Sequence, residues 1–236
     1  MILDLHLHTL LGSSDSSLTI EQAAEKLIER GLDGACLTEH SSIWEKNSDQ
    51  IEDVFSQFNL KIFRGLEITT NYGHIISIGF EQYIPGSHDI ELLRKFSTDH
   101  NAFLISAHPS RRLFGKEKFQ QNLLYKGREY IPSIDEFSSN ILFEYVDGVE
   151  VLNGGNNLEE NNFAFEAAKL NGKIMTGGSD AHSESGVGIF ATEFAFETNE
   201  ISEIVNQLKS NQVQPVFRKD NKWIAVDEQY YKEHNI

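Results

Sequence analysis

Two short segments near opposite ends of the chain carry histidine and aspartate at spacings that suit metal binding. His6 and His8 stand in an N-terminal stretch in which apolar and polar residues alternate, the period of a β-strand. On a strand the two imidazoles point to the same face, where they can converge on one ion. Asp180 and His182 form a second pair, directly after a short apolar run that ends in Gly-Gly. Both patterns indicate a metal centre.

Five further candidate ligands lie between these pairs, each where a strand-like segment meets a loop. They are Asp15, His40, Glu67, His74 and His108. Nine candidates are too many for one ion and suit up to three ions that share carboxylates. Six of the nine are imidazoles, which argues against magnesium or calcium, because those ions prefer oxygen ligands. Manganese, iron or zinc suits the mixture, so we expect up to three of these divalent ions.

The three remaining histidines, His88, His100 and His234, lack this placement. A histidine outside such a pattern is more often a surface or hydrogen-bonded structural residue than a ligand. We therefore expect these three on the surface.

The segments that position the candidates alternate between helix and strand patterns. After the first strand, Thr19 and Gln22 form a capping box that opens a helix, and Gly31 ends it. A short buried strand at 34–38 then delivers His40. This β-α-β order is typical of a parallel sheet or barrel, in which the chemistry lies at the carboxyl ends of the strands.

One pair of candidates is expected to break the parallel order. The strand at 61–66 delivers Glu67, and only residues 68–73 separate Glu67 from His74 and the strand at 75–78. Six residues cannot hold a crossover helix, so these two strands should pair antiparallel. That arrangement places His74 at the same end of the sheet as Glu67.

The rest of the chain continues with helices and strands, followed by a hairpin that turns at Asp220-Asn221. The expected helices are 49–58, 89–100, 134–143, 158–170 and 201–209, and the expected strands are 103–107, 148–152, 173–176, 192–196 and 213–217. No repeat, linker or low-complexity tract divides the sequence. We therefore expect one α/β barrel domain over residues 1–236.

A basic and aromatic segment at 110–131 is the one concentration of positive charge in an acidic sequence. Its cations are Arg111, Arg112, Lys116, Lys118, Lys126 and Arg128. We interpret this segment as a loop or lid beside the site. Arg111 or Arg112, which directly follow the His108 loop, could bind a phosphate bidentately.

Composition narrows the expected partners. The formal net charge of −16 repels polyanions, which argues against extended contact with nucleic acid. No apolar run approaches the roughly 18 residues of a membrane span, and the chain enters a strand at once, so we expect no membrane contact and no signal peptide. Cys36 is the single cysteine, which excludes an internal disulfide and favours a reducing cytoplasm.

The motifs, taken in order, resemble those of the polymerase and histidinol phosphatase (PHP) family. The matching segments are Asp4–Thr9, Thr38–His40, Gly65–Glu67, His74, Ala107–Pro109 and Gly178–His182. The resemblance runs from residue 2 to about residue 197. It implies a distorted (β/α)7 TIM-like barrel, a trinuclear metal site and phosphoesterase activity.

The resemblance also implies how the nine residues divide among three ions. His6, His8, Glu67 and Asp180 would hold the first ion. Glu67 would bridge to a second ion held by His74 and His108, and a third would be held by Asp15, His40 and His182.

Two positions depart from the family pattern. Glu39-His40-Ser41 replaces the Asp-His-Asp that the family often has, so the surroundings of His40 should differ. Asp15 stands where some members have histidine, which could shift the preferred metal away from zinc. Neither departure removes an expected ligand.

The expected reaction is hydrolysis of a small phosphate ester. Two ions that share a carboxylate can lower the pKa of water toward about 7, and the resulting hydroxide would attack phosphorus. Glu67, Asp180 and His182, together with Arg111 or Arg112, are the expected catalytic residues. The expected substrate is a small phosphate monoester, such as a nucleotide or an amino-alcohol phosphate.

Four alternatives stay open. A histidinol-phosphate phosphatase would share the metals and differ in its pocket lining. An oligonucleotide exonuclease is disfavoured by the acidic charge, and an amidohydrolase-type hydrolase normally uses fewer ligands. A non-catalytic metal-binding module would be expected to have lost ligands, whereas all nine are present.

Overall fold

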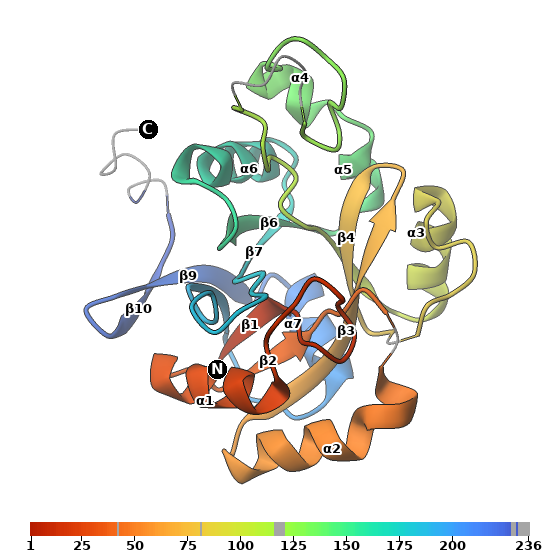
Figure 1. Cartoon of the computed structure of the whole chain (residues 1–236). Coiled ribbons are helices and arrows are strands. Elements are labelled where there is room, and N and C mark those ends of the chain that lie inside the picture. Colours follow the sequence, from red (N-terminus) through yellow and green to blue (C-terminus); the bar gives the residue numbers. More distant parts are fainter. Residues whose placement is uncertain (42, 81, 116–120, 228–229, 231–236) are drawn as a thin grey trace.

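The computed structural model describes residues 1–236 except 42, 81, 116–120, 228–229 and 231–236, and leaves the side chains of 44 and 45 undescribed. Its strands form one curled sheet in the order β10-β9-β8-β1-β2-β3-β4-β5-β6-β7 (Figure 1). The strands are β1 (Ile2–Leu7), β2 (Gly34–Leu37), β3 (Lys61–Thr70), β4 (Gly73–Ile78), β5 (Phe103–Ser106), β6 (Gly148–Asn153), β7 (Ile174–Gly178), β8 (Phe190–Phe194), β9 (Val213–Lys219) and β10 (Lys222–Ala225). The helices are α1 (Ile20–Arg30), α2 (Trp44–Gln57), α3 (Ile90–Asp99), α4 (Ile134–Ser138), α5 (Leu142–Tyr145), α6 (Leu158–Leu170) and α7 (Ile201–Lys209).

Seven consecutive strands, β1 to β7, curl until the two ends of the series meet. Just beyond β7, Ala181 forms an isolated parallel bridge with Leu7 of β1. The backbone N–H of Asp180 donates to the His6 carbonyl at 2.7 Å, and the N–H of His8 donates to the Ala181 carbonyl at 3.2 Å. This contact partly closes the sheet into a distorted barrel, the fold class that the sequence predicts.

The barrel departs from a regular (β/α)7 pattern in two places. β4 runs antiparallel to both β3 and β5, and β3 joins β4 without a helix between them. β8, β9 and β10 add an antiparallel extension on the other edge of β1. The remaining neighbouring strands from β1 to β7 pair in parallel. The result is a curled ten-stranded sheet whose first seven strands form the barrel.

The close approach of β7 to β1 requires a glycine. A Cβ built on Gly178, the last residue of β7, would lie 2.5 Å from the Cβ of His6 and 2.9 Å from Oε1 of Glu150. Atoms that are not bonded do not approach that closely, so a side chain here would push β7 away from β1. The Gly-Gly that precedes the Asp-x-His pair is therefore part of the barrel closure.

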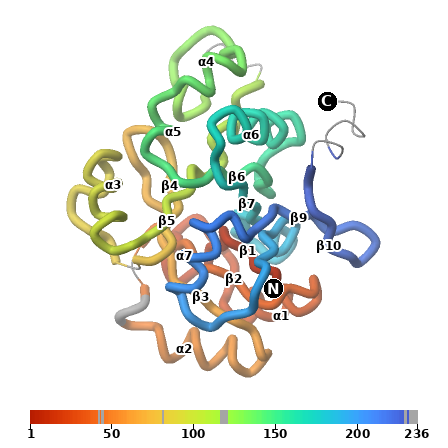
Figure 2. The backbone as a smooth tube through the Cα atoms, turned by 180° about the vertical axis from the view of Figure 1, so that it is seen from behind, coloured from red at the N-terminus to blue at the C-terminus, as the bar shows by residue number. Residues whose placement is uncertain are grey.

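Helices cover the outside of the sheet. In α1, Thr19 accepts a hydrogen bond from the N–H of Gln22 in the expected capping box, and Gly31 ends the helix with φ at 72°. From behind, α7 lies across the strands (Figure 2), and its Ile204 shares a buried cluster with Phe103 of β5. No helix in the described part of the chain has the length and apolar character needed to span a membrane.

The antiparallel pairing of the two strands around Glu67 and His74 is confirmed, but β3 is longer than expected. β3 continues through Glu67 to Thr70, because a turn at Asn71-Tyr72 joins it directly to β4. Glu67 therefore lies inside a strand rather than after its end. The hairpin between β9 and β10 is also confirmed, with φ at 51° for Asp220 and 60° for Asn221, as a two-residue turn requires.

The expected helix at 134–143 is wrong, because the structure has two short helices there, α4 and α5. Asn140 lies between them, and its side-chain oxygen accepts a hydrogen bond from the N–H of Leu142 at 3.0 Å. Asparagine that bonds to nearby backbone in this way competes with helical hydrogen bonding. Smaller shifts occur where α2 begins at Trp44 rather than 49 and β8 begins at Phe190 rather than 192.

Candidate metal centre

The nine candidate ligands converge at one end of the barrel, from β1, the β3–β4 hairpin and the loops after β1, β2, β5 and β7. Candidate ligand atoms within 4.8 Å of one another form three groups among the described residues. The groups are His6–His8–Glu67–Asp180, Glu67–His74–His108 and His8–His40–His182. Of the other histidines, His88 and His100 are exposed as expected, and His234 lies outside the described residues.

The first group is buried in the barrel. Nε2 of His6 and Nε2 of His8 lie 3.0 Å apart. Oε2 of Glu67 is 3.5 Å from the former and 3.2 Å from the latter. Oδ1 of Asp180 is 3.3 Å and 3.4 Å from the same two nitrogens. Two imidazoles and two carboxylates thus face one common point.

Glu67 also belongs to the second group, through its other oxygen. Oε1 of Glu67 is 2.9 Å from Nδ1 of His74 and 3.1 Å from Nε2 of His108. The two oxygens of one buried carboxylate therefore face two different sets of imidazoles. This is the geometry that a carboxylate bridging two ions requires.

The third group extends from buried His8 to the open edge of the site, where Asp15 lies beside His40 and His182; we call Asp15, His40 and His182 the open group. Oδ2 of Asp15 is 3.7 Å from Nε2 of His40 and 3.5 Å from Nε2 of His182. The exposed fraction of the side chain is 61% for Asp15, 31% for His40 and 29% for His182. All nine candidates are thus brought together, but the open group is accessible to solvent and the first group is not.

Two of the candidates have left-handed backbone conformations. The φ angle is 32° at His108, after β5, and 53° at Asp180, after β7. Residues other than glycine adopt this conformation rarely, and where they do it often serves a site. Each turn leads the chain away from its strand at the residue that must face the cluster.

The sequence did not point to Glu150, which holds the first group in place. Oε1 of Glu150 is 2.9 Å from Nδ1 of His6, and Oε2 accepts hydrogen bonds from the His108 N–H at 2.9 Å and from Nδ2 of Asn153 at 2.8 Å. Carboxylates behind ligating histidines fix the orientation of the ring and increase its basicity. The available signal was one acid in the otherwise apolar expected strand at 148–152.

Glu39 has a comparable position, but behind His8 rather than His40. Its carboxylate accepts from the Thr9 N–H at 2.9 Å and from Oγ of Ser13 at 2.5 Å. Oγ of Ser13 in turn lies 2.9 Å from Nδ1 of His8. The departure of Glu39 from the family pattern therefore affects the buried group, through Ser13.

The two candidate arginines have different surroundings. Arg111 forms an ion pair with Oδ2 of Asp180 and donates from Nε to Oδ1 of Asn156 at 3.2 Å. Arg112 is exposed, and its backbone N–H donates to Oε1 of Glu160 at 2.6 Å. The sequence alone could not show that Arg111 and Arg112 would have different surroundings. Of the lysines expected beside them, Lys116 and Lys118 lie outside the described residues.

Charges within the cluster shift the pKa values strongly. Burial alone would lower the pKa of His6, but neighbouring carboxylates, first that of Asp180, outweigh burial and raise it well above its usual value. At His8 burial has the same opposing effect, and hydrogen bonds with Asp180 and Glu67 raise the pKa to about 9. Burial would raise the pKa of Glu67, but the charge of His6 and the His108 hydrogen bond hold it well below its usual range. Burial likewise opposes ionisation of Asp180, but the charge of His6 and a hydrogen bond from His8 hold its pKa far below the usual range, so the carboxylates of Glu67 and Asp180 are ionised.

This donor set fits divalent transition-metal ions. Ionised carboxylates in a buried site need a cation close by. The imidazoles of His6 and His8 add nitrogen donors, a mixture that suits manganese, iron or zinc. Arg111 contacts Oδ2 of Asp180, the oxygen opposite the one that faces the two histidines. Oδ1 of Asp180 therefore still faces His6 and His8.

The fold and these donors define a metal-dependent hydrolase. Residues 4–175 match the family described as PHP domain, and residues 159–213 match the family described as PHP-associated. The first match covers more than half of the chain, so this protein belongs to the PHP family. The resemblance of the sequence motifs is thereby confirmed. A comparison with curated proteins finds no match.

Solved structures share the fold at low sequence identity. PsfC from Pseudomonas syringae PB-5123 matches with a TM-score of 0.62 and 18% identity, over 93% of this chain and 92% of that chain. A protein from Bifidobacterium adolescentis described as a metal-dependent phosphoesterase matches with a TM-score of 0.54 and 15% identity, over 77% of this chain and 88% of that chain. An amidohydrolase from Chromobacterium violaceum, with bound sulfate and no metal, matches with a TM-score of 0.54 and 14% identity, over 76% of this chain and 87% of that chain. At identities this low, the structural matches show a common fold and nothing further.

Proposed function

We propose that this protein is a metal-dependent phosphoesterase that releases inorganic phosphate from a small phosphate monoester, at a centre of up to three manganese, iron or zinc ions. The observation that carries the proposal is Glu67, whose two oxygens face two different sets of imidazoles within hydrogen-bonding distance. A shared carboxylate is the usual means of holding two ions close enough to act on one phosphate. The family assignment and the assignment of one structural neighbour agree with it.

Bound ions would supply an activated water and would neutralise charge on the phosphate oxygens. In the reaction, a water oxygen bonds to phosphorus, the ester P–O bond breaks, and the leaving oxygen takes a proton. His6, His8, Glu67 and Asp180 hold their donor atoms toward one point in the buried part of the site. His182 stands at the open edge, where a substrate can enter.

A small substrate is favoured by the space beside the site. A cavity of about 210 Å³ adjoins His74 and His108, below the roughly 300–1,000 Å³ typical of sites for drug-sized ligands. The net charge of −16 disfavours a long polyanion such as an oligonucleotide. We therefore propose a small organic monophosphate, with a nucleotide, an amino-alcohol phosphate or histidinol phosphate within this class.

The proposal is tested by counting metals and measuring phosphate release on the same protein. Protein purified without chelators should hold close to three transition-metal ions per chain and hydrolyse members of a panel of phosphate monoesters. His108→Ala should lose metal and activity, whereas the matched control His88→Ala, at an exposed histidine, should lose neither.

Three outcomes would reject the proposal. One is a metal content of one ion or none that reconstitution does not raise. Another is activity confined to oligonucleotides. The third is hydrolysis of amide or lactone substrates without any phosphate ester, which would instead favour an amidohydrolase.

A further inference from the structure

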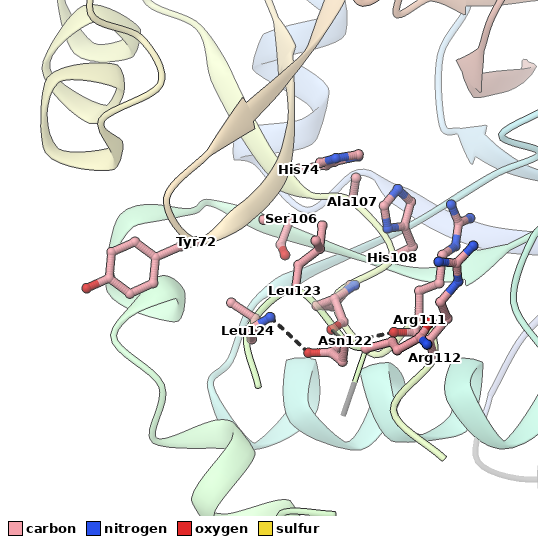
Figure 3. Close-up of a pocket in the computed structure, with 13 residues that line it drawn as sticks. Tyr72, His74, Ser106, Ala107, His108, Arg111, Arg112, Asn122, Leu123 and Leu124 are labelled. Carbon is pink, nitrogen blue, oxygen red and sulfur yellow. Dashed lines mark hydrogen bonds between the residues drawn. The ribbon is translucent and has the colours of Figure 1, made fainter. Parts of the chain in front are cut away.

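The cavity beside the second ligand group is built from three segments, residues 72–74, 106–112 and 121–124 (Figure 3). His74 and His108 form its inner end, and Tyr72 lies at the far end, with its hydroxyl pointing away. Leu123 and Leu124 form the wall opposite these histidines. A phosphate held at the inner end would therefore have its organic part directed along this wall.

The wall is fixed to the loop that carries His108. The side chain of Asn122 is buried, and its Nδ2 donates to the carbonyls of Pro109 at 2.7 Å and Arg111 at 2.9 Å. Its Oδ1 accepts from the N–H of Leu124 at 3.0 Å. Asn122 thus uses its polar atoms to hold the wall, and the wall presents apolar side chains to the cavity.

The cavity has an unusual charge for this protein. Its described lining contains two arginines and no aspartate or glutamate, although the chain has 36 acidic and 20 basic residues. Arg111 is held by Asp180 and Asn156. Arg112 is another lining residue, and its side chain has no hydrogen-bond or ion-pair partner among the described residues. One guanidinium is thus available to a ligand.

We propose that this cavity binds the leaving group of the substrate and that Arg112 binds a second anionic group on it, a carboxylate or a further phosphate. This inference rests on the proposed phosphoesterase function and names the substrate class within it. An exposed guanidinium on an acidic protein attracts an anion, and Arg forms paired hydrogen bonds to carboxylate or phosphate oxygens. Leu123, with an exposed fraction of 48%, would be covered by an apolar portion of the same leaving group.

The test compares two substrates that differ only in the second anionic group, phenyl phosphate and 4-carboxyphenyl phosphate. The wild-type protein, as purified with its metals, should favour the carboxylated substrate by about 10- to 100-fold in kcat/KM, the range for a charge-assisted hydrogen bond. Arg112→Ala should remove most of this preference, because kcat/KM should fall far more for 4-carboxyphenyl phosphate than for phenyl phosphate. Arg112→Lys should restore part of the preference.

A matched control separates a local contact from a general loss of charge. Lys126 is an exposed cation on the same basic segment but does not line the cavity. Lys126→Ala should therefore keep the substrate preference. Equal losses from Lys126→Ala and Arg112→Ala would overturn the proposal, as would a wild-type protein that turns over both substrates equally.

A binding measurement distinguishes failure of this inference from failure of the proposed function. Calorimetry can compare benzylphosphonate with 4-carboxybenzylphosphonate, which resist hydrolysis. Tighter binding of the carboxylated compound, lost in Arg112→Ala, would support the anion site even if no phosphate ester were hydrolysed. Hydrolysis without any preference, in turnover and in binding, would reject the anion site and leave the phosphoesterase proposal standing.

Discussion

The buried ligand group around His6 and Asp180 and the open group around His40 and His182 use similar donors in different surroundings. Asp180 is tied to Arg111 and His6 to Glu150, and both lie inside the barrel. Asp15, by contrast, is 61% exposed and stands before the two partly exposed histidines of the open group. Donor type alone therefore does not determine how firmly an ion is held.

The difference lies in the residues behind the ligands. Behind the buried group, Glu150 bonds to β1, to the loop after β5 and to Asn153 of its own strand, and Ser13 links His8 to Glu39. In the open group, Nδ1 of His182 lies 2.9 Å from the carbonyl of Asp180, only two residues earlier in the chain. Ligands that are oriented in advance lose less freedom when an ion binds. We expect the buried group to retain its ion longest and the open group to exchange its ion with solvent.

The largest expected effect is that of Glu67→Ala, because this residue serves two groups. The variant should lose at least two of the expected ions and nearly all phosphate release, roughly 1,000-fold or more in kcat/KM. Elemental analysis together with kinetics measures both quantities. His182→Ala provides the comparison, since it removes a ligand from the open group alone and should lose about one ion. Equal metal content in the two variants would contradict the bridging position of Glu67.

An intermediate effect is expected for Glu150→Gln, which keeps the shape of the side chain. An amide group in place of one carboxylate oxygen must face a donor, either the His108 N–H or the ring of His6. Residues behind metal ligands commonly change metal affinity by about 10- to 100-fold. We expect a loss in that range for the buried group, measured by competition with a chelator.

The control for this variant is Glu144→Gln, at an exposed glutamate on α5. It should leave metal affinity unchanged. If Glu150→Gln weakened the open group more than the buried one, the proposed cause of the difference between them would be wrong.

The smallest effect is expected for Asp15→Asn. Its carboxylate is mostly exposed and more than 3.4 Å from either histidine nitrogen, and exposed charges interact weakly because water screens them. We expect a fall of less than about tenfold in kcat/KM, reversed by excess metal. Titration of activity with added metal measures this, with Asp53→Asn on the surface of α2 as the control. Loss of the buried ion in Asp15→Asn would show that the two groups do not act separately.

Local patterns in the sequence predicted much of the fold, and they predicted that the nine candidate ligands lie close together. The capping box of α1 and the short connection between Glu67 and His74 each determine the local structure through residues that are close in the sequence. The break at Asn140 was missed, because the side-chain hydrogen bond to Leu142 competes with a helical pattern that looks continuous.

Long-range partners could not be predicted in the same way. Glu150 meets His6 across 144 residues, and nothing near Glu150 in the sequence shows which residue it will face. Arg111 and Arg112 are identical in type and adjacent, yet the turn at Arg112, with φ at 59°, gives the two side chains different surroundings. Such distinctions arise from packing between distant segments.

The meeting of β1 with β7 also determines when the site can exist. His8 and His182 are separated by 174 residues, which a ribosome adds in about 9 to 35 seconds. Throughout that interval the nascent His-x-His strand is without Asp180 and Gly178. Of the three ligand groups, only Glu67–His74–His108 would be complete in a chain interrupted before β7. The buried group is thus assembled only after the ribosome has passed β7.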